Sequence, residues 1–144
     1  MEWNEGLAVG IRELDEQHKN LIEAANVIES TVASRDRWYS IHAAMVRLSE
    51  AARIHFAVEE CLMSIFGYPK LEEHHTEHQR FTEKLKSLQN ESLHARVSDE
   101  MAQFSKDWLQ DHIVGMDRAM AEYFTSARTK AADGISRKRI RSTG

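Results

Sequence analysis

Histidine and carboxylate side chains occupy positions of this 144-residue chain where helical periodicity calls for apolar residues. Six of them lie on predicted core faces, and a seventh follows in the last helical segment. Burying a polar group without a partner costs a few kcal/mol, so six such groups would cost on the order of 10 kcal/mol, comparable to the stability of a whole domain. A shared metal centre would satisfy them together. The seven candidate ligands are His18, His55, Glu59, His74, His78, His112 and Asp117.

The spacing of these candidates supports one shared centre. His55-x-x-x-Glu59 and His74-x-x-x-His78 are each separated by one helical turn, so both members of a pair face the same way. Helices that start near residues 12, 38, 70 and 96 would bring all the candidates within about two turns of one level, at a rise of about 1.5 Å per residue.

Asp117 is the candidate that a regular helix does not accommodate. It lies five residues after His112, which at about 100° per residue turns it roughly 140° away from the same face. Both side chains can point inward only if the helix is locally irregular. We therefore predict a one-residue bulge or a break near Gly115, and such bulges often occur at functional sites.

Five imidazoles and two carboxylates are too many donors for one metal ion. A tetrahedral zinc ion takes four ligands, and structural zinc sites usually include thiolates. Two octahedral ions bridged by both carboxylates would use the whole set, with three histidines on one ion, two on the other, and one coordination place left open. Mixed imidazole and carboxylate ligands suit iron or manganese.

The elements that must position these residues are predicted from apolar residues at steps of three and four. Four such segments follow a lead-in at residues 1–11, whose apolar side chains are available to pack. Breaks are predicted at residues 34–36, 67–69 and 90–92. Short loops between long helices imply antiparallel neighbours, so we expect an all-α, up-down-up-down four-helix bundle.

The bulk properties suit one domain with a real core, because 42% of the residues are hydrophobic and 29% are charged. The formal net charge of −4 argues against a body that binds nucleic acid. The one cysteine, Cys61, cannot form a disulfide within the chain and is expected to be a small core or boundary residue. An acidic start and the absence of long apolar runs predict no signal peptide and no membrane insertion, so we expect a cytoplasmic protein.

The composition changes at about residue 131. Residues 131–144 carry four Lys or Arg residues and one Asp. We interpret residues 1–130 as the metal-binding domain and residues 131–144 as a basic tail or linker. A contact of this tail with nucleic acid or a membrane is the weaker alternative.

The chain resembles the bacterial hemerythrins over nearly all of residues 1–130. Any one of the matching motifs is weak, but all of them, in order and correctly spaced, make a strong signal. The motifs are Asp15-x-Gln17-His18, His55-Phe56-x-x-Glu59, the Gly67-Tyr68-Pro69 turn with His74-x-x-x-His78, and Trp108-Leu109-x-x-His112-Ile113-x-x-x-Asp117.

This resemblance implies a di-iron centre that binds dioxygen reversibly. One iron would be held by His74, His78 and His112, and the other, five-coordinate iron by His18 and His55. Glu59 and Asp117 would bridge the irons together with an oxo or hydroxo group, and dioxygen would bind at the open iron. An apolar pocket would keep water out, and its lining would be Leu21, Phe56, Trp108, Ile113 and Val114.

The family includes stand-alone oxygen carriers and sensor domains fused to signalling outputs. Because residues 131–144 look like a linker, we expect an oxygen- or redox-sensing input to a C-terminal signalling output domain, with a stand-alone carrier as the alternative. We do not expect an enzyme, since an apolar pocket disfavours reduction of peroxide or nitric oxide.

A ferritin-like di-iron oxidase is the nearest structural rival, because those bundles use Glu-x-x-His on two helices. Glu72-x-x-His75 and Glu91-x-x-His94 fit that string. The first pair lies off the core stripe and the second falls in a predicted loop. His42, His75 and His94 fall outside the pattern of core-facing histidines, and we expect them to be surface residues.

Overall fold

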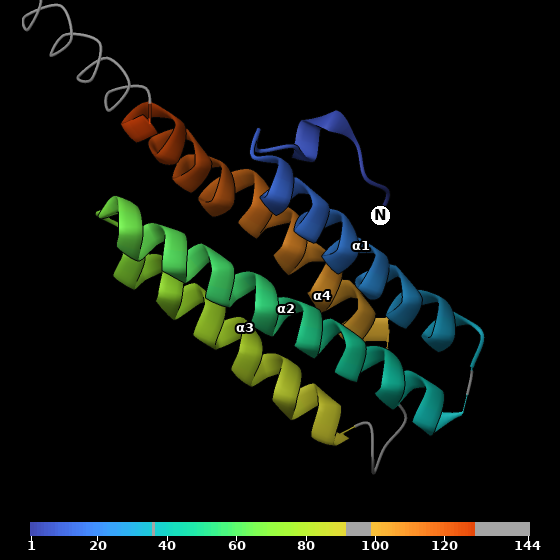
Figure 1. Ribbon diagram of the computed structural model, residues 1–144. Helices are drawn as coiled ribbons and strands as arrows, with labels where there is room; N and C mark the ends of the chain where they lie inside the picture. Colours follow the sequence, from blue (N-terminus) through green and yellow to red (C-terminus); the bar gives the residue numbers. More distant parts are fainter. Residues whose placement is uncertain (36, 92–98, 129–144) are drawn as a thin grey trace, which may run out of the picture.

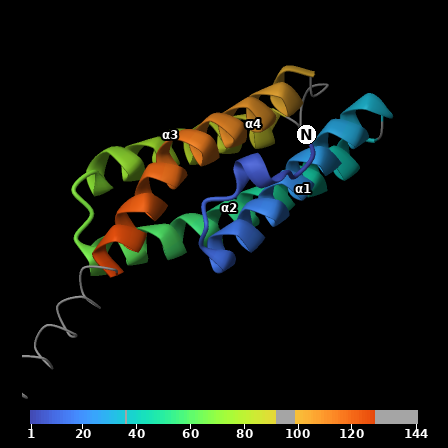
Figure 2. The ribbon, with the colours of Figure 1, turned by 90° about the horizontal axis from the view of Figure 1, so that it is seen from above.

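The structure, a computed structural model, describes residues 1–35, 37–91 and 99–128. Its four long helices form an antiparallel bundle (Figures 1 and 2), so the predicted all-α, up-down-up-down fold is confirmed. Helix α1 packs against α2 and α4, and α2 packs against α3. The helices are α1 (Arg12–Ala33), α2 (Trp38–Phe66), α3 (Leu71–Glu91) and α4 (Asp99–His112).

Two short elements accompany these helices. A 3₁₀ helix, η1 (Glu5–Leu7), precedes α1, and a π-helical segment, η2 (Ile113–Asp117), continues directly from α4. Residues 118–128 are again α-helical, so α4, η2 and these residues form one long irregular helix.

The turn between α2 and α3 confirms the break predicted at residues 67–69. Gly67 takes the left-handed conformation (φ 62°, ψ 43°), which costs glycine no steric clash. The backbone N–H of Tyr68 donates to the carbonyl of Met63 at 2.9 Å, and that of Gly67 donates to Ser64 at 3.3 Å. The first predicted break is also confirmed, because α1 ends at Ala33. The third break was predicted at residues 90–92, but Asn90 and Glu91 still belong to α3, and Ser92 lies outside the described residues.

Apolar packing forms two clusters along the bundle. On α1, for example, Leu21 belongs to the larger cluster and Leu14 to the smaller one, with His18 between them. The other helices repeat this order, so the layer of candidate ligands is enclosed by apolar layers on both sides. The smaller cluster consists of Leu14, Met63, Tyr68, Met120 and Phe124.

The lead-in is ordered, as predicted, and lies beside α1 (Figure 1). Leu7 is buried in the larger cluster, and Trp3 and Val9 pack against that cluster. Asp15, in the first turn of α1, accepts hydrogen bonds from the backbone N–H groups of Val9 (2.8 Å) and Gly10 (3.3 Å). A carboxylate here also suits the positive end of the helix dipole.

The position of Cys61 differs from the expectation. Cys61 is exposed, so it is not a core or boundary residue. Its neighbours Glu59 and Met63 point inward, and a residue two positions away is turned about 200° from each of them. His42 and His75 are only half-buried, and His94 lies outside the described residues.

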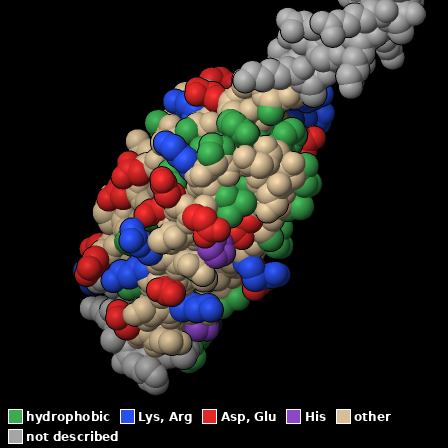
Figure 3. All heavy atoms as spheres, turned by 90° about the vertical axis from the view of Figure 1, so that its left-hand side faces the viewer, with side chains coloured by type: hydrophobic (Ala, Val, Ile, Leu, Met, Phe, Trp, Pro, Cys, Tyr) green, Lys and Arg blue, Asp and Glu red, His purple; other side chains and the backbone are tan. Residues whose placement is uncertain are grey.

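On the face shown in Figure 3, acidic and basic side chains are interspersed. None of the helices in the described part of the chain is both long and apolar enough to cross a membrane.

Candidate metal centre

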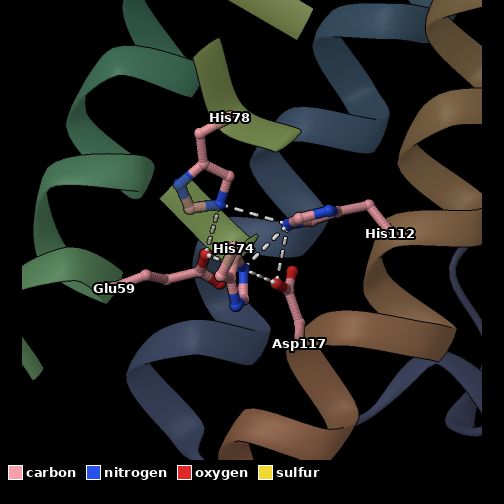
Figure 4. A group of neighbouring side chains, drawn as sticks. All are labelled: Glu59, His74, His78, His112 and Asp117. Carbon is pink, nitrogen blue, oxygen red and sulfur yellow. Dashed lines mark hydrogen bonds and ion pairs between the residues drawn. The ribbon is translucent and has the colours of Figure 1, made fainter. Parts of the chain in front are cut away.

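The structure brings all seven candidate ligands together in one buried layer. Each of the four helical segments contributes, and every side chain belongs to a residue that is at most 5% exposed. Figure 4 shows five of them converging from α2, α3 and the irregular fourth helix. His18 comes from α1, His55 and Glu59 from α2, His74 and His78 from α3, His112 from α4, and Asp117 from η2.

Each of the two carboxylates faces two sets of histidines. Glu59 Oε1 lies 2.8 Å from His55 Nε2 and 3.7 Å from His18 Nε2, whereas its Oε2 lies 3.0 Å from His78 Nε2 and 3.3 Å from His74 Nε2. One oxygen therefore serves the pair of histidines, and the other serves the set of three.

Asp117 repeats this arrangement from the opposite side. Its Oδ2 lies 2.9 Å from His18 Nε2, and its Oδ1 lies 2.9 Å from His112 Nε2 and 3.0 Å from His74 Nε2. The donors thus form two groups that share both carboxylates. One is Glu59, His74, His78, His112 and Asp117, and the other is His18, His55, Glu59 and Asp117.

The polar atoms of this layer fit metal ions better than they fit one another. Both oxygens of Glu59, both of Asp117 and Nε2 of His18 and of His55 are buried, and their polar neighbours are other candidate ligands of the same layer. His112 Nε2 lies 3.1 Å from the Nε2 atoms of both His74 and His78, so three ring nitrogens converge. Buried polar atoms are normally paired. Cations placed between the donors would pair them all, and imidazole with carboxylate is a donor set that suits iron.

The charges of the layer shift its pKa values strongly. Burial lowers the pKa of His55 and of His74, but the close contacts of each with Asp117 and Glu59 outweigh burial and raise both values to about 9. Burial raises the pKa of Glu59 and Asp117, yet the surrounding histidines hold both well below their ordinary values. Without metal, the layer is therefore held together by protons on histidines and by ionised carboxylates.

This electrostatic balance predicts how the metal-free protein responds to pH. A pKa raised from 6.5 to about 9 means that His55 and His74 contribute stability that is fully present below pH 6.5 and is lost as the pH rises through about 9. We expect the melting temperature of chelator-treated protein to fall by roughly 5–15 °C between pH 6.5 and 9.5. Circular dichroism melts in chelating buffer measure this, and a melting temperature that rises across the interval would contradict it.

The irregularity predicted near Gly115 is confirmed as a π-helix over Ile113–Asp117. It adds one residue to a turn, which is why two residues five positions apart, His112 and Asp117, both point inward. Gly115 is not among the residues with positive φ, and a Cβ at this position would meet nothing within 4 Å. The bulge therefore does not require glycine on steric grounds.

Changing the number of residues in the bulge tests whether metal binding depends on the direction in which Asp117 points. Inserting one alanine between Gly115 and Met116 would turn Asp117 by about 100°, and we expect the protein then to lose its ability to hold two metal ions. Deleting Gly115 would place Asp117 four residues after His112, on the same face of a regular helix, and we expect metal binding to survive. Metal analysis after reconstitution and gel filtration tests both, and loss of metal in the deletion variant would contradict this account.

The residues expected to line an apolar pocket are not equally buried. Leu21, Phe56 and Ile113 are at most 5% exposed, and Phe56 stacks on the ring of His78 with centroids 3.9 Å apart. Trp108 is half-buried and stacks on His112 at 4.3 Å. Val114 is 39% exposed, because in η2 it follows the inward-facing Ile113 and turns toward the surface. Val114 is thus outside the buried group.

Two partners of the ligands were not assigned a role from the sequence. His55 Nδ1 lies 2.6 Å from the amide oxygen of Gln17, and His78 Nδ1 lies 3.4 Å from Glu60 Oε1. Glu60 also contacts His75 Nδ1. Gln17 and Glu60 each adjoin a candidate ligand in the sequence, and Gln17 also belongs to the Asp15-x-Gln17-His18 motif. The contact with Glu60 also accounts for His75 without a ferritin-like site.

Comparisons with known proteins agree with this geometry. A family model described as the hemerythrin HHE cation binding domain matches residues 9–124. The bacteriohemerythrin of Clostridium acetobutylicum is 30% identical over 122 residues, covering 81% of this chain and 95% of that protein. The myohemerythrin of Theromyzon tessulatum is 30% identical over 116 residues, covering 81% and 87%. A crystal structure of wild-type hemerythrin has a TM-score of 0.80 at 26% identity, covering 86% of this chain and 97% of that one.

Proposed function

Because the chain belongs to the hemerythrin HHE cation-binding family, we propose that it binds dioxygen reversibly at a di-iron centre held by the seven buried side chains. Members of this family bind dioxygen at two irons, and the buried histidine and carboxylate cluster suits such a pair. The ligand assignment is that expected from the sequence: three histidines on one iron, His18 and His55 on the other, and Glu59 and Asp117 as bridges.

The observation that carries this proposal is that the two donor groups differ in the number of residues they offer. One group offers five residues and the other four, with both carboxylates in common. With one further bridging oxygen, the iron of the three-histidine group would be six-coordinate, and the iron of the two-histidine group would keep one open place. An open place on only one iron suits the binding of a single small ligand.

The irons, when bound, supply the open coordination place and the electrons that dioxygen binding needs. The protein supplies their surroundings. Leu21, Phe56 and Ile113 are buried beside the ligands and exclude water, which slows irreversible oxidation of the irons. The carboxylates hold the two irons together, and Gln17 orients the ring of His55.

Reversible oxygenation can be tested on protein reconstituted with ferrous iron under argon. We expect about two irons per chain and optical bands that appear with dioxygen and disappear under argon. Irreversible bleaching, or a spectrum unaffected by dioxygen, would contradict the function. A multiple-turnover assay with a reductant and peroxide or nitric oxide tests our expectation that the protein is not an enzyme.

We further propose that the oxygenated centre is read out as a signal. His112 and Asp117 lie on the helix that continues through residues 118–128 toward the basic segment at 131–144, which would act as a linker to an output domain. The alternative is a stand-alone carrier.

Hydrogen exchange separates the two roles. If the protein is a sensor, the amide hydrogen-exchange rates of residues 118–128 should differ between the oxygenated and the reduced protein. A carrier requires no such difference. The domain boundary is tested by ending the chain after residue 130, which should leave oxygen binding unchanged.

A further inference from the structure

One histidine in each group of ligands contacts a residue outside the layer through Nδ1, and these two outer residues differ in charge. An imidazole that faces a metal through Nε2 carries its proton on Nδ1 and donates it to a neighbour. For His55 in the two-histidine group, that neighbour is Gln17, a neutral amide at 2.6 Å. For His78 in the three-histidine group, it is Glu60, a carboxylate at 3.4 Å.

In the described part of the chain, no lysine or arginine forms an ion pair with Glu60. Its ion-pair contacts among the described residues are with His75 and His78 only. It lines a groove of about 760 Å³ between α2 and α3, in which the nearby Arg53 pairs with Glu50 at 3.1 Å. The side chain of Glu60 is 30% exposed, so the low-dielectric interior lies on one side of its carboxylate and solvent on the other.

A carboxylate in this place acts on the iron through the imidazole. A ring that donates to a carboxylate becomes a more basic ligand and gives more electron density to its metal. A fixed negative charge outside the ligand also favours the more positive oxidation state of that metal. Gln17 also accepts from the ring of His55 but adds no fixed charge, because an amide carries no net charge.

We propose that Glu60 is a positioning residue that holds His78 and lowers the reduction potential of the three-histidine iron relative to the two-histidine iron. This inference rests on the proposed di-iron site. If a one-electron oxidant such as ferricyanide took one electron from the diferrous pair and became ferrocyanide, the iron held by His78 would be the ferric one and the two-histidine iron would stay ferrous. No bond within the chain forms or breaks in this step.

Exchanging the two outer residues tests the proposal. Glu60→Gln removes the charge but keeps an oxygen that can accept from His78, and we expect the first reduction potential of the iron pair to rise. Gln17→Glu adds a charge beside His55, and we expect the potential to fall. In the double variant, the two-histidine iron should be the ferric one in the one-electron-oxidised form. Mössbauer spectroscopy measures this. Unchanged potentials in both single variants that retain two irons would overturn the proposal.

Two further variants distinguish this role from a structural one. His75→Ala removes the surface partner of Glu60 but keeps its charge, so the potential should stay at or below that of the original protein. If the pair of Glu60 and His75 were only structural, His75→Ala and Glu60→Gln would shift the potential alike. Glu50→Gln, on the same helix and in the same groove, is the matched control and should leave the potential unchanged.

The contact itself can be tested with redox-inactive zinc in place of iron, which would occupy Nε2 of His78 and leave its proton on Nδ1. In ¹⁵N spectra of the zinc-loaded protein, this N–H should exchange with water more slowly than in the Glu60→Leu variant. Equal exchange rates in the two proteins would overturn the positioning role. Failure of reversible oxygenation would contradict the proposed function alone, because potentials and ¹⁵N spectra do not depend on dioxygen.

Discussion

Replacing Glu59 by alanine is expected to leave the protein unable to hold two iron ions. Its two oxygens face different histidine sets, at 2.8 Å from His55 Nε2 and 3.0 Å from His78 Nε2, so one substitution removes a ligand from both ions. Asp117→Ala should behave similarly, since Asp117 contacts the same two sets. We expect metal analysis after ferrous reconstitution to give about one iron per chain or fewer.

Matched substitutions show whether the loss is specific. Glu50→Ala removes a carboxylate from the same helix, but this residue is exposed and pairs only with Arg53. His42→Ala removes a half-buried histidine outside the layer. Both variants should keep two irons per chain and the optical spectrum of the original protein. Full iron content in Glu59→Ala would show that it is not a bridge.

Removal of the metal is expected to destabilise the whole bundle. The ligands are buried, and without metal only protons on the histidines pair them with the carboxylates of Glu59 and Asp117, so an empty layer keeps the cost of burial without its full compensation. Ions bound at about 1,000 times their dissociation constant contribute about 4 kcal/mol to the free energy of unfolding. We therefore expect the chelated protein to melt roughly 8–16 °C below the iron-loaded protein.

The pH of this comparison matters, because protons partly replace the metal. At pH 6.5 or below, His55 and His74 are protonated in the metal-free protein and pair with the carboxylates. The difference between loaded and metal-free protein should therefore be larger at pH 9 than at pH 6.5. Equal melting temperatures of the two forms at pH 9 would show that the layer is stable without metal.

The sequence by itself determined which histidines and carboxylates face the core and where the fourth helix must be irregular. Helical periodicity sets the direction of each side chain on its own helix, so His18, His55 and His78 could be assigned to core faces before any packing was known. The angle between His112 and Asp117 follows from the same rule, and it predicted an irregularity that the structure shows as η2.

Only the tertiary structure decided which side chains of neighbouring helices come into contact. The division of the carboxylate oxygens between two histidine sets depends on the rotation and spacing of neighbouring helices, which no local period specifies. The same holds for Gln17 and Glu60, which reach ligands on other helices, and for Val114, whose exposure follows from the π-helix. Local sequence sets where a side chain points, whereas the packing of the four helices sets what it meets.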